Sequence, residues 1–392
     1  MASIRDLPKE IIALIITHLI RSPLRWVFES HRDAIAAKTA AQLRLVCRKW
    51  AACLYEDHLY RTLRFKSASR SVAFINYFRG RSQLLPRPRC QRLIIHRIWT
   101  EKPRSRDSRL DIITSPIMDS LIELFTDTIV TLDLRFVDFM NLPMQTIHCI
   151  QRAERLQNLH LRLLRSTYEE LLVPNPDCFN SLVVGIKNLK SLFLALPLSL
   201  PRRFGFSSGI QYPAITHLHI DLAAQTPGVI LSLAIALKSS LRVLSLHANR
   251  SYDTGLVLPL YETLRETLEG LAVTTESLLA PILDFKFPKL KTITVQCLYN
   301  SVANLFSQDI FVHAPIQVIA LNSRSACWSK LTFKQDPFTN LRNLQKMVFL
   351  ATDGDYSPLP QFLAACEAHH IKCEYLDHSD VFLVMMRDHG CR

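Results

Sequence analysis

An apolar pattern that returns every 22 to 33 residues constrains this chain more than any other feature of its sequence. Each copy has one apolar residue and two more at the third and fifth positions after it. This spacing predicts a short strand, and the copies are followed by stretches with helical spacing, as at 227–238. The nine copies are Ile129/Leu132/Leu134, Leu156/Leu159/Leu161, Leu189/Leu192/Leu194, Ile215/Leu218/Ile220, Leu241/Leu244/Leu246, Leu268/Leu271/Val273, Leu290/Ile293/Val295, Ile316/Ile319/Leu321 and Leu344/Met347/Phe349.

A single strand and helix of this kind cannot cover its own apolar face, whereas stacked copies can. The interval is that of leucine-rich repeats, so the sequence predicts an α/β solenoid with parallel strands on its concave side and helices on its convex side. The alternative is an ordinary α/β domain with leucine-rich strands, in which the same apolar spacing would have to occur nine times by chance. Less regular copies and a closing strand are predicted at Leu63/Phe65, Leu93/Ile95 and Ile371/Cys373/Tyr375.

The N-terminus begins with a strongly apolar segment that predicts a helix over 8–20. Pro8 suits the first turn of a helix, and Leu7, Ile11, Ile15 and Leu19 recur every four residues. Other apolar residues fill the remaining faces. A helix that is apolar nearly all round must pack on one side against its own chain and on the other against a binding partner.

A second apolar block predicts a helix over 41–54. Between the two blocks, Ser22-Pro23 should end the first helix, and 24–41 predicts an inserted helix. The second block has one apolar stripe, from which its basic residues are absent. The residues of that stripe are Leu43, Val46, Cys47, Trp50 and Leu54.

Over residues 4–58 the two blocks resemble an F-box, with a longer spacer at 20–42 than that family usually has. The repeats are similar to those of leucine-rich-repeat F-box proteins, although the expected asparagine occurs only as Asn249. The resemblance implies a substrate-recognition subunit of an SCF-type E3 ubiquitin ligase, without a catalytic site of its own, that binds a Skp-family adaptor and through it a cullin. The positions that match the adaptor-binding motif are Leu7, Pro8, Ile11, Ile15, Leu19, Leu43, Val46 and Trp50.

These patterns predict three parts. An F-box helical domain with an insertion occupies 1–58, basic and irregular first repeats occupy 59–128, and a solenoid with a C-terminal cap occupies 129–392.

Polar residues within the repeats predict a binding groove. Because side chains alternate across a strand, the residues at even positions after the first apolar residue should face the concave side. Their mixed charge and aromatic content suit a protein segment better than a nucleic acid. We therefore expect the target protein to contact Asp133, Arg135, His160, Arg162, Phe193, His217, His219, Asp221 and His247.

The net charge of +13 is concentrated in the N-terminal part of the chain. Residues 1–110 hold 23 Lys plus Arg against 8 Asp plus Glu, or +15, and the remainder holds 24 against 26, or −2. The basic residues between 79 and 109 could contact phosphate backbones or serve in nuclear import. No base-reading module accompanies them, so nucleic-acid binding is the less favoured reading. The alternative function is a repeat scaffold that binds protein or nucleic acid independently of a ubiquitin ligase.

Metal binding and catalysis find less support in the sequence. No nucleotide-binding loop, nucleophile elbow or His-Glu-x-x-His motif occurs among the nine glycines and fourteen histidines. We therefore expect no cofactor, metal or catalytic residue. Two groups could still resemble metal ligands, namely His217-x-His219-x-Asp221 with His247, which also suits a polar groove, and Cys366, His369, His370 and Cys373.

The segment 11–20 has the length of a secretory core, but acidic residues precede it and no cleavage site follows. No run of 18 apolar residues suggests a membrane span. Ten scattered cysteines fit reduced thiols better than a disulfide framework. These observations predict a cytoplasmic or nuclear protein that does not bind membranes.

Overall fold

The structure is a computed structural model of the 392-residue chain, which folds as two compact units, 1–202 and 203–392. The predicted division into 1–58, 59–128 and 129–392 is a different one and stays a prediction. No helix among the described residues has both the length and the apolar character that crossing a membrane requires. The described residues are 8–21, 29–80, 88–100, 111–138, 140–164, 176–198, 211–248, 252–297, 305–322, 336, 338–350 and 360–376.

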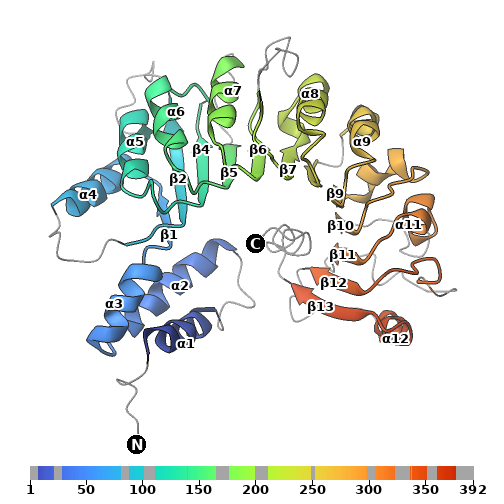
Figure 1. The fold of residues 1–392 in the computed structure, drawn as a ribbon, viewed down its shortest axis with the longest axis horizontal. Coiled ribbons are helices and arrows are strands. Elements are labelled where there is room, and N and C mark those ends of the chain that lie inside the picture. The colour runs from blue at the N-terminus through green and yellow to red at the C-terminus, as the bar shows by residue number, and fades with distance from the viewer. Residues whose placement is uncertain are drawn as a thin grey trace, which may run out of the picture. The chain divides into compact units, whose positions relative to one another are not determined.

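The first unit has three N-terminal helices, followed by parallel strands that alternate with helices (Figure 1). The strand order is β1-β2-β4-β5-β6, and β3 pairs with β2. Helices α4 to α7 stand on one side of these strands. The elements are α1 (Lys9–Arg21), α2 (Glu29–Leu43), α3 (Arg48–Asp57), β1 (Thr62–Phe65), α4 (Ala68–Arg79), β2 (Arg92–Trp99), β3 (Ile113–Thr114), α5 (Ser115–Glu123), β4 (Thr131–Phe136), α6 (Met144–Gln151), β5 (Asn158–Leu163), α7 (Pro176–Gly185) and β6 (Ser191–Ala195).

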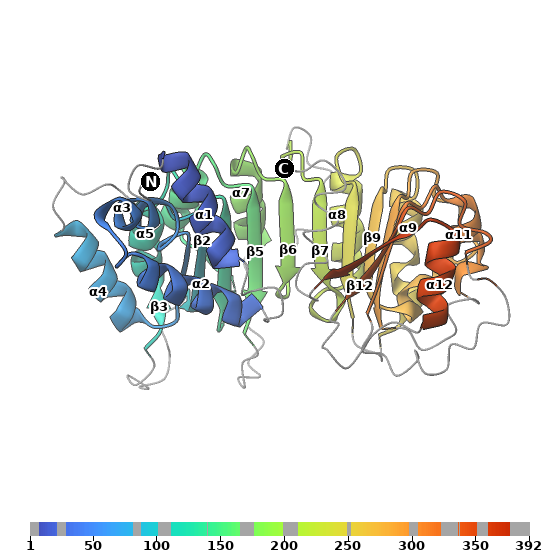
Figure 2. The ribbon, with the colours of Figure 1, turned by 90° about the horizontal axis from the view of Figure 1, so that it is seen from below.

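The apolar residues of successive copies lie in register across the strands of the first unit. Leu132 is opposite Leu159, and Leu159 is opposite Leu192. All three are essentially buried, as are their partners two residues on. A fully buried leucine contributes roughly 1.5–3 kcal/mol, so each added copy extends one continuous core. The early copies join this stack, since Leu63 is opposite Leu93. Figure 2 shows β5 and β6 side by side in this sheet.

The second unit continues the same alternation with seven parallel strands, paired in sequence order from β7 to β13 among its described residues. The predicted closing strand is β13. Its elements are β7 (His217–Asp221), η3 (Leu222–Ala224), α8 (Pro227–Leu237), β8 (Val243–His247), η4 (Thr254–Val257), α9 (Leu258–Leu264), β9 (Gly270–Thr275), η5 (Glu276–Ile282), β10 (Thr292–Cys297), α11 (Asp309–His313), β11 (Val318–Asn322), β12 (Lys346–Leu350), α12 (Pro360–Ala368) and β13 (Lys372–Leu376), where η marks a short 3-10 helix.

Helix α8 shows why the segments between strands become helices. Pro227 occupies its first turn, where a missing N–H costs nothing. Ile230, Leu233 and Leu237 recur at helical spacing and are buried against the strands. Together with the parallel strands, this packing confirms the predicted α/β leucine-rich-repeat-like fold.

The N-terminal helices form a small core of their own. Ile12, Ile16 and Ile20 lie on one face of α1 and pack in one buried cluster with Trp50 and Leu54 of α3. Helix α1 ends before Ser22-Pro23, as predicted, and the predicted inserted helix is α2.

The predicted single helix over 41–54 is wrong. Helix α2 ends at Leu43 and α3 begins at Arg48, with a turn between them in which Cys47 is extended. Leu45 and Val46 lie in this turn and are exposed. Helical spacing continues through the turn in the sequence, so apolar periodicity alone does not reveal the break.

Aromatic side chains connect the N-terminal helices to the first repeats. The ring of Tyr55 in α3 lies 5.2 Å from that of Tyr60, and Tyr60 lies 5.5 Å from Phe78 in α4. Phe78 in turn lies 5.9 Å from Phe125. Such edge-to-face contacts stabilise a joint beyond the area that they bury.

Candidate protein-binding surfaces

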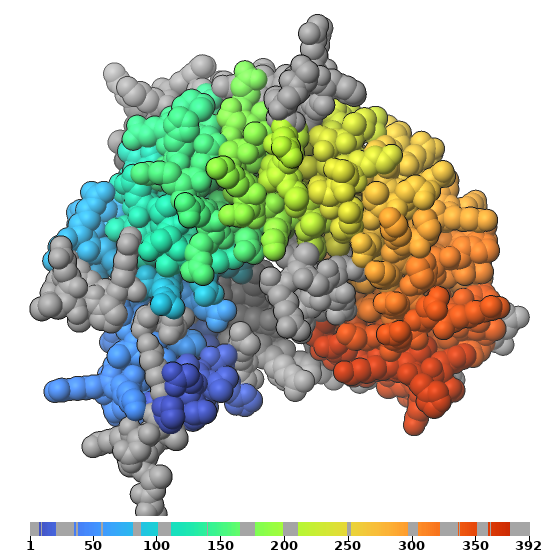
Figure 3. All heavy atoms as spheres, viewed as in Figure 1, coloured from blue at the N-terminus to red at the C-terminus, as the bar shows by residue number. Residues whose placement is uncertain are grey.

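Exposed apolar side chains gather on α1 and on the turn between α2 and α3. Leu14 is 66% exposed and Leu45 is 78% exposed. Ile11, Leu19 and Val46 are exposed as well. We call these five residues the N-terminal apolar surface. In Figure 3 the atoms of the N-terminal helices, in blue, lie at the surface of the molecule. Several large apolar side chains exposed on neighbouring elements indicate an interaction site.

The predicted adaptor-binding residues divide into three groups. Pro8, Ile11, Leu19 and Val46 are exposed, whereas Ile15 and Leu43 are half-buried and pack against the helical core. Trp50 is 4% exposed, so its predicted role as a contact residue is wrong: its indole fills the core between α1 and α3. Leu7 lies outside the described residues.

Leu14 and Leu45 belong to the N-terminal apolar surface but were not among the predicted contact residues. Helix α1 is apolar nearly all round, so its sequence does not distinguish the covered face from the exposed one. The exposure of Leu45 follows from the turn between α2 and α3, which the sequence pattern did not predict. For Leu14 the sequence did contain a signal, because Leu14 lies three residues after Ile11 and therefore shares its face of the helix.

On the strand face of the first unit, two arginines meet one buried carboxylate. Arg135 Nη2 donates to Asp133 Oδ2 at 2.9 Å and Arg135 Nε donates to Oδ1 at 3.1 Å. Arg162 Nε lies 3.7 Å from the same Oδ1. Burial alone would raise the pKa of Asp133, but the charges of Arg135, Arg162 and His160 outweigh it and lower that pKa.

Phe193 forms the base of this cluster. The Arg162 guanidinium carbon lies 4.1 Å from the centre of the Phe193 ring, within cation–π range. The ring of His160 lies 5.4 Å from that of Phe193, and the two residues are opposite each other in the sheet. The structure therefore brings together five of the predicted groove residues on adjacent strands.

Additional cations surround this site. Arg64 of β1 lies in the same row of the sheet as Asp133, with Ile94 between them. Burial, together with the charges of Arg135, Arg64 and Lys66, lowers the pKa of His96 to about 4, and the charge of Asp133 opposes this shift. We call Arg64, Lys66, Arg135 and Arg162, whose charges act on His96 or on Asp133, the cationic cluster.

Arg64, Lys66 and His96 were not among the predicted groove residues. The signal was present in the sequence, because Arg64 falls between Leu63 and Phe65, two apolar residues of an early copy. The same alternation that selected Asp133 selects Arg64. The irregularity of β2 obscured His96, since the strand register shifts between Ile95 and Ile98.

Two predicted groove residues do not face an open surface. Asp133 and His217 are fully buried, so the prediction that they contact a target is wrong. Neighbouring side chains on adjacent strands enclose Asp133, and Thr216 Oγ1 lies 2.7 Å from His217 Nδ1. Alternation predicts the face of the strand on which a side chain lies, but it does not predict whether neighbouring side chains cover that side chain and bury it.

The remaining predicted groove residues of the second unit are accessible to different degrees. His219 and Asp221 are half-buried and His247 is exposed. Asp221 is opposite His247 in register, and its Oδ1 accepts a hydrogen bond from the Ala223 N–H at 3.1 Å, which caps η3. Beyond β7, the corresponding face is an apolar cluster in which Val243, Ala272 and Val348 are buried. Among the described residues of β8 to β12, this face is therefore largely apolar.

Neither predicted metal-ligand group has ligating geometry in the part of the chain that the structure describes, because no set of three or more His, Cys, Asp or Glu side chains there could hold a metal ion. His369 instead hydrogen-bonds to Asp336. Many of the basic residues between 79 and 109 lie outside the described residues.

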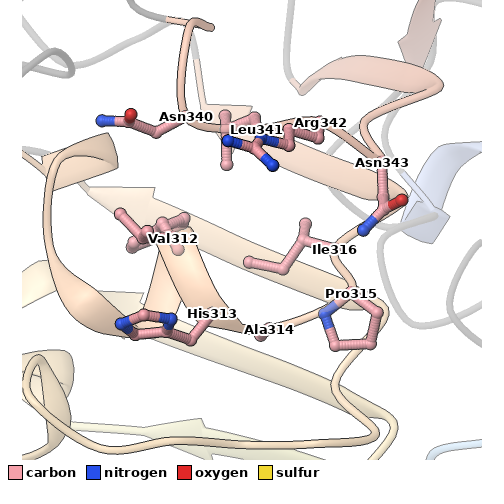
Figure 4. A pocket seen from close by; sticks show the side chains of 10 residues that line it. Val312, His313, Ala314, Pro315, Ile316, Asn340, Leu341, Arg342 and Asn343 are labelled. Carbon is pink, nitrogen blue, oxygen red and sulfur yellow. The ribbon is translucent and has the colours of Figure 1, made fainter.

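A shallow pocket lies between the end of α11 and the segment before β12 (Figure 4). Val312, His313 and Ile316 form one wall, and Leu341 and Arg342 form the other. Val312, His313 and Arg342 are exposed, and His313 Nε2 lies 3.9 Å from Asp309 Oδ1. The pocket brings together no pair of a nucleophile and a base, so its geometry supplies no catalytic arrangement.

No protein-family model matches the chain, and no curated protein matches it. Among solved structures, internalin C2 from Listeria monocytogenes strain 4b F2365 is similar, with 17% sequence identity and a TM-score of 0.25. The match covers 61% of this chain and 85% of the internalin chain. The assignment of this chain to the leucine-rich-repeat-like fold rests on its own strand order and burial.

Proposed function

We propose that this protein is a substrate-recognition subunit of an SCF-type E3 ubiquitin ligase. The N-terminal helices would bind a Skp-family adaptor and through it a cullin, and the strand face of the repeats would bind the protein to be ubiquitinated. The proposal assigns no catalytic residue to this chain. It also implies that the protein works in the cytoplasm or the nucleus.

One observation carries the adaptor part of the proposal. Helix α1 buries Ile12, Ile16 and Ile20 within its own unit, yet leaves Ile11 and Leu14 exposed. Burying one such side chain in an interface is worth roughly 1.5–3 kcal/mol before the costs of association. A partner that covers the N-terminal apolar surface would therefore gain enough to form a stable complex.

Recruitment explains how such a chain acts without chemistry of its own. A target held next to the ubiquitin-carrying enzyme reacts as if it were at high effective concentration. The repeats of the first unit supply a rigid support for this purpose, since β4, β5 and β6 share one hydrogen-bond ladder and one leucine core.

The proposal is tested by copurification of the full chain with a Skp-family adaptor. Leu14→Asp with Leu45→Asp places two charges in the N-terminal apolar surface, and we expect it to abolish copurification. The matched control is Leu256→Asp, at a leucine of η4 that is 43% exposed, which should retain the adaptor. Undiminished copurification of the double variant would refute the proposed docking surface.

The alternative function is a repeat scaffold that works without a ubiquitin ligase. Salt-dependent retention on nucleic acid, together with no adaptor binding by the wild-type chain, would favour it.

A further inference from the structure

We propose that Cys366 and Cys373 form a site of reversible thiol oxidation, at which a hydroperoxide joins the two residues in a disulfide bond. The two cysteines belong to the last repeat that the structure describes, one in α12 and the other in β13. Both are free cysteines in the structure. This inference goes beyond the proposed function and does not depend on it.

The C-terminal end of α12 returns the chain directly into β13. The N–H of Ile371 donates to the Cys366 carbonyl oxygen at 2.8 Å. The N–H of His370 donates to the Glu367 carbonyl oxygen at 3.0 Å. With the positive φ of 56° at His370, these two hydrogen bonds make a Schellman motif. The motif reverses the chain within one turn, so β13 begins at Lys372 in contact with the helix before it.

The register of β13 places Cys373 on the side of the sheet that α12 covers. Cys373 is opposite Met347 of β12, and Met347 is fully buried. Phe349 lies two residues after Met347 on the same face, and its ring is 5.8 Å from that of Phe362 in α12. Cys366 reaches this side of the sheet from α12, where it is 1% exposed. The two cysteines therefore meet between the last helix and the last strand of the described repeats.

The two thiols are already in contact. A hydrogen bond joins them, and burial, together with the charge of Cys373 and this hydrogen bond, raises the pKa of the Cys366 thiol. Cys373 Sγ also lies 4.0 Å from the Ile371 carbonyl oxygen. The sulfurs of a disulfide are about 2 Å apart, so thiols in hydrogen-bond contact need only a small movement to form one.

The surroundings of the two cysteines assign them different roles. Cys373 is half-buried on the last described strand, whereas Cys366 is buried in the core, so a small hydroperoxide reaches Cys373 first. The raised pKa of Cys366 keeps that thiol protonated. Because the thiolate is the reactive form of cysteine, Cys373 is the residue that is oxidised first and Cys366 is the residue that resolves it.

The reaction consumes one peroxide for each disulfide, written here for hydrogen peroxide. The Cys373 sulfur attacks one peroxide oxygen, the O–O bond breaks, and the other oxygen leaves with the thiol proton as water. Cys373 is then a sulfenic acid. The Cys366 sulfur attacks the sulfur of this acid, the S–O bond breaks, and the hydroxyl leaves with the Cys366 proton as a second water. Each sulfur has lost one electron, and the peroxide has gained two.

A bond between α12 and β13 would fix the end of the repeat stack. β13 pairs with β12 along one edge, and within the described residues its other edge has no strand partner. A strand with one neighbour opens more readily than a central one. The disulfide would close the short loop 366–373 and so reduce the entropy of the unfolded chain. Oxidation should therefore stabilise this end of the second unit.

The test treats the purified and fully reduced full chain with hydrogen peroxide and maps its disulfides by mass spectrometry. Lys372 lies between the two cysteines, so trypsin separates them into the peptides 347–372 and 373–387, which stay joined only through a disulfide. We expect a joined pair that is about 2 Da lighter than the sum of the two reduced peptides. Dithiothreitol should separate the pair again.

Two variants and one physical measurement accompany the mapping. Cys373→Ser should abolish the joined peptides. Cys178→Ser is the matched control and should keep them, because Cys178 of α7 is as buried as Cys366 but has no second thiol beside it among the described residues. The melting temperature of the bridged wild-type chain should exceed that of the reduced chain by about 4 °C. This last comparison needs no variant to fold.

Recovery of the two peptides only as separate species, after other thiols of the chain have been oxidised, would overturn the inference. So would Cys366 joined to several different cysteines in similar amounts, because such partners meet only in an unfolded chain. An unchanged or lower melting temperature of the bridged chain would likewise contradict a native geometry that is ready for the bond. None of these measurements involves the adaptor, so their outcome is distinguishable from that of the ligase proposal.

Discussion

At the residue scale, the carboxylate of Asp133 stays ionised although it is fully buried, because the guanidinium groups of Arg135 and Arg162 compensate its charge. Arg135 is 22% exposed, so its side chain keeps some contact with water, whereas the carboxylate of Asp133 keeps none. A buried charge with partial compensation is sensitive to the loss of either partner.

Removing Arg135 should therefore destabilise the protein. Arg135→Ala leaves Asp133 with Arg162 alone, at 3.7 Å, and we expect the free energy of unfolding to fall by about 2 kcal/mol. Arg152→Ala is the control, because Arg152 pairs with Glu123 where both side chains are more than half exposed, and it should cost less than about 1 kcal/mol. Urea denaturation measures both, and equal losses would contradict a buried ion pair.

His96 should make stability depend on pH. Its pKa is about 4 in the folded protein and about 6.5 in the unfolded chain, so the unfolded chain takes up a proton first as the pH falls. The stabilisation is complete above pH 6.5 and is lost between pH 6.5 and about 4. Urea denaturation across this range should show a weaker pH dependence for His96→Gln than for wild type.

His148→Gln, at an exposed histidine of α6, is the control for this measurement and should keep the pH dependence of the wild-type protein. An unchanged dependence in His96→Gln would mean that His96 titrates alike in the folded and unfolded states.

Sequence reasoning placed side chains on the correct strand face but did not foresee their burial. Asp133 and His160 were expected on one face, and the register confirms that they are opposite each other. The burial of Asp133 depends on how the side chains of three strands fold over it. That arrangement depends on tertiary packing, so the alternation of apolar and polar residues in the sequence does not predict it.

At the element scale, adjacent helices α6 and α7 approach closely at Gly185. A Cβ added there would lie 1.9 Å from Gln151 Nε2, whose N–H donates to the Ser181 carbonyl oxygen at 2.7 Å. The absence of a side chain at this glycine lets Gln151 link the two helices.

Gly185→Ala should displace Gln151 and lower the free energy of unfolding by about 1 kcal/mol, the worth of one hydrogen bond. Gly228→Ala is the matched control, because nothing lies within 4 Å of its added Cβ in the first turn of α8. It should be neutral or stabilise by a few tenths of a kcal/mol. Thermal unfolding compares the two, and identical shifts would refute the close approach.

Elements with a strong period were predicted well, and elements defined by a turn were not. The strands around Leu132, Leu159 and Leu192 follow from the sequence because each pattern must bury its leucines in register. The turn between α2 and α3 does not, since Leu45 and Val46 continue the apolar pattern that a longer helix would have.

At the scale of the whole molecule, one chain carries two surfaces of different chemistry. The N-terminal apolar surface suits a partner that removes it from water, and the cationic cluster suits a partner that brings negative charge. The apolar pattern of the N-terminal helices predicted part of the first surface, and the alternation of side chains along the repeat strands predicted part of the second.

Isothermal titration of the purified full chain with a purified Skp-family adaptor measures whether the N-terminal helices bind that adaptor. We expect saturable one-to-one binding with a negative heat-capacity change, because the exposed leucines and isoleucines are removed from water at the interface. Absence of any complex at protein concentrations of tens of micromolar, with the wild-type chain folded, would contradict it.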